Sequence, residues 1–179
     1  MTLQENALLV HGSTDALANA QAAVSATGHD GATYYTSKTL NLAAASTPNP
    51  AGTLAVGTVD LNTNAVAFGA DSLLIVDSTA LNGESAFIYD QPEGTGGQAS
   101  VTEGAKIHAV NVKHDQNVII FGEGFETVTG EWEDVTTDTP MLGATYNNTD
   151  KTLSVEAKNA KDIYPDLSDE MADLVTQYY

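Results

Sequence analysis

The sequence predicts a mainly β protein, an antiparallel sandwich or barrel with a short N-terminal helix in an extended arm and a short C-terminal helix. From residue 54 onward, short runs rich in β-branched and aromatic residues recur at a spacing of about ten residues, and Gly, Asn, Asp or Pro separate them. No segment recurs at a fixed period, so the sequence does not indicate a repeat protein.

The first fifty residues differ in composition from the rest of the chain. Leu, Ile, Val and Phe supply 8 of these 50 residues but 31 of the remaining 129, and the only charged side chains here are Glu5, Asp15, Asp30 and Lys38. A segment so poor in large apolar side chains does not form a core of its own. We therefore divide the chain into an arm, residues 1–50, and a β-rich body, residues 51–179. The arm needs cover from its own body or from a neighbouring subunit.

Two elements are expected within the arm. Ser13-Thr14-Asp15 precedes an alanine-rich run, residues 16–26, that Gly28 follows, and this pattern of cap and stop signals predicts a helix. Residues 32–42 alternate and are rich in Thr and Tyr, which predicts an extended strand.

The body is expected to consist of short strands and one final helix. Clusters of Asn and Asp at residues 60–64, 113–117 and 146–151 predict hairpin turns, and residues 166–177 predict a helix with acids in its first turn. The predicted strands are residues 54–61, 65–68, 72–76, 86–89, 106–112, 118–121, 125–129, 142–146 and 152–157.

Charge and composition exclude several function classes. The chain has 24 acidic residues against 6 lysines, no arginine and no cysteine, and its net charge is −18. Because acids are not in surplus for a globular chain, the negative charge reflects a shortage of bases. Disulfides, thiolate metal sites and thiol catalysis are excluded. So few cations argue against partners such as nucleic acid or an anionic membrane, and the low pI suits a marine or halophilic habitat.

Targeting signals are not evident in the sequence. Residues 1–10 lack the cationic start and long apolar run of a secretion signal, and no window approaches the roughly 18 apolar residues of a membrane helix. The chain is expected to fold where it is made.

A calcium loop is the first candidate site. Asp60, Asn62, Asn64 and Asp71 have the spacing of its ligands, but Ala65 stands where such a loop needs glycine, and the flanks read as strands. A plain hairpin turn is the favoured interpretation.

The acidic stretch, residues 123–138, is the second candidate. It holds six carboxylates and no base, and Glu131 and Glu133 would share one face of a strand with Trp132 on the other face. Paired acids can hydrolyse glycosides, but one tryptophan on the opposite face makes a poor sugar cleft. A solvated edge that discourages strand aggregation is favoured, with loose divalent-cation binding at a subunit junction as the alternative.

Other single residues are better explained by structure than by chemistry. His108 and His114 are separated by turn formers, Ser13 is a helix cap, and Gly94–Gly97 lacks the lysine and helix of a phosphate loop. Asn147–Thr149 is a formal glycosylation sequon on a predicted turn, and the paired tyrosines at 34–35 and 178–179 suit either a core or a subunit contact. We therefore expect no catalytic site, no cofactor and no metal, and the protein is not expected to be an enzyme.

The Ala/Thr-rich leader, with Asn19–Val24 and Asn41–Ser46, and the strand-turn-strand pattern of Tyr146–Val155 resemble small virion proteins of tailed viruses, in particular capsid decoration or cement proteins. The resemblance is one of general composition and strand pattern over the whole chain. It implies a β fold that binds the outside of a capsid lattice, often as a trimer, and uses an arm to staple neighbouring capsid subunits. The implied partners are the major capsid protein and further copies of the chain, in a virion assembled in the host cytoplasm.

Two alternatives remain open. A tail-tube or tail-accessory subunit would place its acids in a lumen that repels passing DNA and would build rings by strand and arm exchange. An extracellular β-module would bind glycans or calcium, with Trp132 and the acidic stretch as its site.

Overall fold

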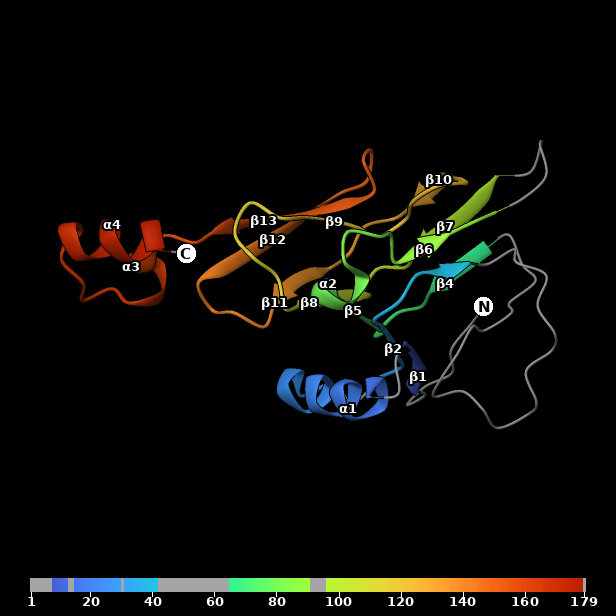
Figure 1. Cartoon of the computed structure of the whole chain (residues 1–179), viewed down its shortest axis with the longest axis horizontal. Helices are drawn as coiled ribbons and strands as arrows, with labels where there is room; N and C mark the ends of the chain where they lie inside the picture. Colours follow the sequence, from blue (N-terminus) through green and yellow to red (C-terminus); the bar gives the residue numbers. More distant parts are fainter. Residues whose placement is uncertain (1–7, 13–14, 30, 42–64, 91–95, 179) are drawn as a thin grey trace.

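Strands form most of the regular structure in the part of the chain that the structure describes. This structure is a computed structural model, and it describes residues 8–12, 15–29, 31–41, 65–90 and 96–178 (Figure 1). The expectation of a mainly β protein with a few short helices is confirmed.

The largest sheet has five strands, and every pairing within it is parallel. Because a parallel sheet buries both faces, its middle strand Leu73–Asp77 is apolar in all but its last residue, and every residue of it is buried. In spatial order the strands are β1 (Leu8–His11), β2 (Thr33–Thr36), β5 (Leu73–Asp77), β8 (Lys106–Val110) and β11 (Asp134–Thr137).

The chain leaves the large sheet and returns to it along a regular path. After each of β2, β5 and β8 it forms a short second side and then a third side before it re-enters the large sheet. The second side holds β3 (Leu40–Asn41), β6 (Phe87–Ile88) and a bridge to Phe121. The third holds β4 (Ala65–Phe68), β7 (Gly97–Val101) and β10 (Phe125–Thr129), all paired in parallel. Successive turns therefore stack into a coil with the pairing of a parallel β-helix.

The parallel pairing departs from the predicted antiparallel sandwich or barrel. Antiparallel pairing in the described residues is confined to a sheet of β12 (Leu142–Asn147), β13 (Thr152–Ala157) and β9 (Asn117–Ile119). Of the two predicted turns within the described residues, the turn at 146–151 makes a hairpin, whereas the turn at 113–117 joins β8 and β9, which belong to different sheets. Alternation and turn residues report an extended chain and its bends, but they do not report which strand lies beside it.

Unequal turns explain why no fixed period is visible in the sequence. Thr33, Leu73, Lys106 and Asp134 are stacked neighbours in the large sheet, yet they are 40, 33 and 28 residues apart along the chain. Insertions such as α2 (Ser78–Leu81) lengthen individual turns without disturbing the stacking.

Aromatic side chains fill the interior of the coil. Tyr34 and Phe87 stack with ring centroids 5.3 Å apart, and Phe87 and Phe121 stack at 5.4 Å. Phe68 from the third side packs against both Phe87 and Trp132, so the rings of several turns form one continuous cluster. All five side chains are at least nine-tenths buried.

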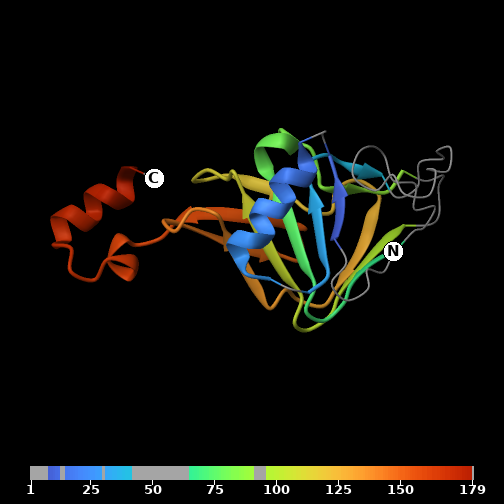
Figure 2. The same ribbon diagram turned by 90° about the horizontal axis from the view of Figure 1, so that it is seen from below.

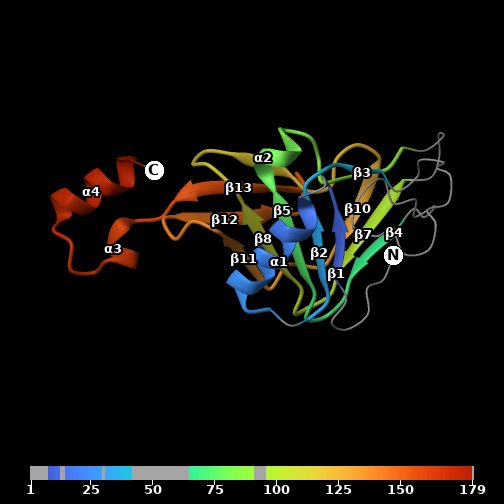
Figure 3. The same cartoon turned by 60° about the horizontal axis from the view of Figure 1, so that its bottom comes forward.

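Helix α1 (Ala16–Thr27) covers the outer face of the large sheet (Figures 2 and 3). Its small Ala16 and Ala20 allow close packing on Val10, Tyr35 and Ile75. The helix agrees with the prediction for residues 16–26, and Gly28 ends it in a left-handed conformation.

The described residues of the predicted arm belong to the coil. Strands β1, β2 and β3 lie within the first fifty residues, and β2 pairs directly with β5 of the predicted body. Of the two kinds of cover considered for the arm, these residues use the body of their own chain. The predicted boundary at residue 50, the predicted strand at 54–61 and the predicted turn at 60–64 lie outside the described residues.

A polar network stacks at the corner where the chain leaves the large sheet. Asp77, buried at the end of β5, accepts hydrogen bonds from the Tyr35 hydroxyl at 3.2 Å and the Asn111 side-chain amide at 3.1 Å. In the next turn Asn111 donates its backbone N–H to Asp138 at 2.8 Å, and Asn111 itself has φ +58°. Asn tolerates this left-handed conformation, so successive turns can bend at the same place.

Two helices follow the antiparallel sheet and project from the body (Figures 1 and 2). These are α3 (Ala160–Ile163) and α4 (Asp169–Tyr178), which we call the helix pair. The predicted helix at 166–177 is confirmed as α4. Strands β1, β7 and β11 were not predicted, because their sequences are polar, glycine-containing or short.

The aromatic cluster predicts a large cost for shortening its central ring. Phe87→Ala is expected to lower the free energy of unfolding by about 3–5 kcal/mol, because the three neighbouring rings of Tyr34, Phe68 and Phe121 cannot collapse into the cavity. Denaturant titration measures this loss. Leu17→Ala, on the exposed side of α1, is the control and is expected to cost about 0.5 kcal/mol or less. Equal effects of the two substitutions would contradict the packing described.

Candidate functional site

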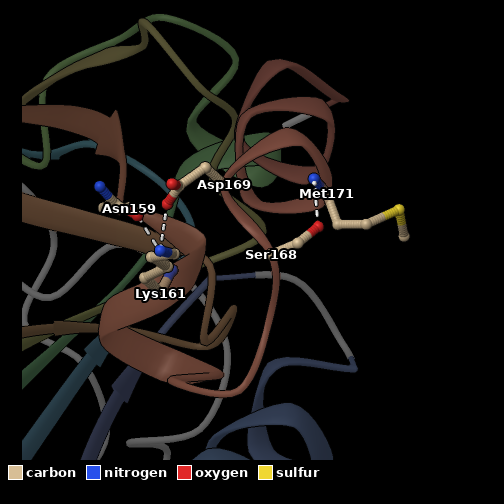
Figure 4. A network of polar contacts seen from close by, with 5 residues as sticks. All are labelled: Asn159, Lys161, Ser168, Asp169 and Met171. Atoms are coloured by element: carbon tan, nitrogen blue, oxygen red, sulfur yellow. Dashed lines mark hydrogen bonds and ion pairs between the residues drawn. The ribbon is translucent and has the colours of Figure 1, made fainter.

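The helix pair is built by local hydrogen bonds and one ion pair (Figure 4). The Ser168 side chain accepts from the backbone N–H of Met171 at 3.3 Å and so caps α4, and Asn159 accepts from the N–H of Lys161 at 2.9 Å and caps α3. The Lys161 ammonium binds the Asp169 carboxylate and thereby joins the two helices. That hydrogen bond and the lysine charge lower the pKa of Asp169.

One side of α4 is committed to packing within the helix pair. Ala172 packs with Ala160 and Met141 in a cluster separate from the interior of the coil. The partly buried Ile163, Leu167 and Val175 complete it. This small core holds the two helices together at the end of β13.

The other apolar side chains of α4 lie in solvent. Met171, Leu174 and Tyr178 are 50, 62 and 87% exposed. Their spacing of i, i+3 and i+7 places them on one face of the helix, and we call them the docking stripe. In Figure 4 the side chain of Met171 points away from the Lys161–Asp169 pair. The apolar surface of α4 is therefore wider than the small core covers.

Acidic residues surround the docking stripe. Residues 160–178 contain five carboxylates and one lysine, and that lysine is bound to Asp169. Asp169, Glu170 and Asp173 lie on α4 itself and are exposed. An apolar stripe with an acidic rim is suited to a partner surface that is apolar at its centre and basic at its edge.

The predicted acidic stretch is divided between different surroundings. Glu131 and Glu133 are exposed as expected, but residues 130–133 are not a strand, because β11 begins at Asp134. Trp132 is buried beneath them, with its ring 5.0 Å from that of Phe68. The tryptophan is part of the core and offers no open face for a sugar ring.

The four histidines do not converge. His114 lies in the turn after β8, where its Nε2 is 3.2 Å from Asp115. His11 is buried and bonds the carbonyl of Lys38 through Nδ1 at 3.0 Å. His29 and His108 do share a hollow beside the end of α1, with Lys106 and Asp134 on its walls. His108 Nδ1 is 2.8 Å from the Thr136 hydroxyl.

Other predicted candidates have plain structural roles or are not described. Asp71 lies in the turn between β4 and β5 with φ +56°, and Ala65 begins β4. Asp60, Asn62 and Asn64 of the calcium-like loop, like Gly94, lie outside the described residues. Tyr34 and Tyr35 are core residues. In the sequon, the Asn147 side chain accepts from the backbone N–H of Thr149 at 2.8 Å. Ser13 also lies outside the described residues.

Two searches of the described residues found nothing further. No three side chains of His, Asp or Glu there come close enough together to hold a metal ion. No helix there has the length and apolarity needed to cross a membrane.

Comparison with known proteins gives no relative. The chain matches no protein-family model, no curated protein and no solved structure.

The sequence alone located α4 but not its docking stripe. Met171, Leu174 and Val175 give the helix an amphipathic pattern, but of the three only Val175 packs in the small core. The sequence feature that could have revealed the stripe is the width of the apolar face of α4, because the four-residue helix α3 is too short to cover all of it.

Buried histidines predict loss of stability on mild acidification. Burial lowers the pKa of His108 below 6.5, although Asp134 and Asp138 act in the opposite direction. In the unfolded chain this histidine binds its proton at about pH 6.5, whereas in the folded chain it does so only at a lower pH. The folded state therefore loses free energy of unfolding as the pH falls from about 6.5 to the lower folded-state pKa. Unfolding midpoints are expected to fall between about pH 7 and pH 5, and to fall less in His108→Gln.

Exposed His114 supplies the control for this measurement. His114→Gln is expected to keep the wild-type dependence on pH, because the His114 side chain is 40% exposed and lies outside the core. An identical pH dependence in wild type and His108→Gln would show that His108 does not contribute.

Proposed function

We propose that this chain is a structural protein of a virion, a capsid decoration or cement protein that binds the outer capsid lattice and stabilises it. The docking stripe of the projecting helix pair is the observation that carries the proposal. Met171 and Leu174 leave large apolar surface in water at a position remote from the coil. Such surface is suited to burial against another protein.

The proposed partner is the major capsid protein, with an apolar depression edged by lysine or arginine. Asp169, Glu170 and Asp173 would face that edge and speed the encounter. The same acidic surface, with only six lysines in the whole chain, disfavours nucleic acid and anionic membranes as partners.

The manner of binding differs from the arm expected from sequence. Because β1, β2 and β3 are used inside the coil, we assign the lattice contact to the helix pair. Copies of the chain would be arranged by the symmetry of the lattice, as a homo-oligomer such as a trimer. Copies that each carry a net charge of −18 repel one another, and the salt of a marine or halophilic habitat would screen this repulsion.

Co-sedimentation with capsids of tailed viruses tests the proposal. The double substitution Met171→Asp and Leu174→Asp is expected to weaken binding about tenfold or more, because it removes the apolar centre of the contact and adds charge. Circular dichroism and thermal unfolding of the coil are expected to stay unchanged, since neither side chain is buried.

A matched control lies on α1. Leu17 is 40% exposed on a helix far from the helix pair, so Leu17→Asp is expected to bind like wild type. Unchanged binding by the double variant would overturn the assignment of the contact. Rings or tubes formed by the purified protein without capsids, seen by electron microscopy, would instead favour the tail-tube alternative.

A further inference from the structure

A hollow of about 660 Å³ opens beside the start of β11. Residues 131–135 form one wall, and residues 144–149, at the end of β12 and the following turn, form the other. Its volume lies within the range of about 300–1,000 Å³ that is usual for small-molecule sites.

Three residues that line this hollow each have a buried polar atom without a hydrogen-bond partner in the described residues. These atoms are the indole Nε1 of Trp132, the hydroxyl of Tyr146 and the side-chain oxygen of Asn148. Trp132 is 8% exposed, and its ring meets that of Tyr146 edge-on at 6.2 Å. Because native proteins pair nearly all buried polar groups, three such atoms in one place indicate a missing partner.

The surrounding bonds hold these side chains in place. Asn148 donates its amide to the carbonyl of Gly130 at 2.7 Å, which fixes its oxygen as the remaining acceptor. Trp132 is held by its contact with Phe68 in the core. Burial raises the pKa of Tyr146, so its hydroxyl keeps the proton and remains a donor.

The charges of the hollow select the class of ligand. Glu131, Glu133 and Asp134 line it, and no lysine does. Phosphates, uronates and other anions would be repelled. A bare cation would meet the carboxylates but would leave the indole N–H without an acceptor, because that group can only donate. A neutral hydroxyl group can accept from Trp132 and donate to Asn148 or a carboxylate at the same time.

We propose that this hollow binds a neutral polyhydroxylated ligand, a carbohydrate, through Trp132 Nε1, the Tyr146 hydroxyl and Asn148. The tryptophan contributes its N–H, because its ring faces are packed in the core. The site is separate from the helix pair and does not depend on the proposed capsid contact, so each can fail without the other.

The single tryptophan of the chain provides a direct readout. Its indole N–H gives one resonance in a ¹H–¹⁵N NMR spectrum, which can be followed while glucose, galactose, mannose, N-acetylglucosamine or their short oligomers are added to the full chain. At least one probe is expected to shift this resonance saturably at concentrations up to about 50 mM, as for a dissociation constant in the millimolar range. Glucuronate is expected to bind more weakly than glucose.

Tyr146→Phe keeps the ring and removes the hydroxyl, and it is expected to weaken binding about tenfold. Tyr164→Phe, at a 52% exposed tyrosine of the helix pair, is the matched control and is expected to bind like wild type. If Tyr146→Phe does not fold, Asn148→Ala takes its place. The absence of a saturable shift with every probe would overturn the proposal, as would equal binding by Tyr146→Phe and wild type. If the indole N–H resonance shows exchange with one bound water and does not shift with any sugar, that water is the partner of the three atoms, and the proposal is wrong.

Discussion

The interior of the coil is the constraint on which the rest of the structure depends. Each turn of the coil encloses an interior space, and side chains from all three sides of the turn are needed to fill it. The stacked rings of Tyr34, Phe87 and Phe121, with Phe68 beside them, do so across successive turns. Close packing of this kind holds parallel strands in register although their partners are tens of residues away in the chain.

Burial on both faces of the large sheet follows from the same constraint. Inward side chains such as Leu74 join the aromatic interior, while outward ones such as Ile75 need a separate cover, which α1 supplies with small alanines. Helix α1 does not extend over β11, so a hollow remains on the outer face near His108 and Thr136. His29, Lys106 and Asp134 also line it. The arm is poor in large apolar residues, but its described strands β1, β2 and β3 are stable because their buried side chains belong to the core of the body.

The end of the coil carries the surfaces that distinguish this protein. The hairpin of β12 and β13 lies beside β11, and with residues 131–135 it encloses the polar hollow over Trp132. Beyond the hairpin, the helix pair has a core of its own, and its docking stripe stays in solvent. An acidic rim around an apolar stripe favours a protein partner, whereas three orphaned hydrogen-bonding atoms favour a small ligand with hydroxyl groups. The two surfaces thus differ in the physics of recognition.

The sequence by itself determined the local features: a mainly β chain, helices at about residues 16–26 and 166–177, the hairpin turn at 146–151, and an acidic chain with only six lysines. Each depends on neighbours within a few residues, such as a cap, a turn former or an alternating pattern. Only the tertiary structure decided that the strands of the coil pair in parallel, that the described residues of the arm belong to the coil, and that Trp132 is a core residue beside a polar hollow. Stacking depends on contacts between positions such as Thr33 and Leu73, whose separation changes from turn to turn, and no local pattern encodes that distance. The exposure of Met171 and Leu174 likewise depends on tertiary structure, because it follows from the short length of α3, the helix that packs against α4.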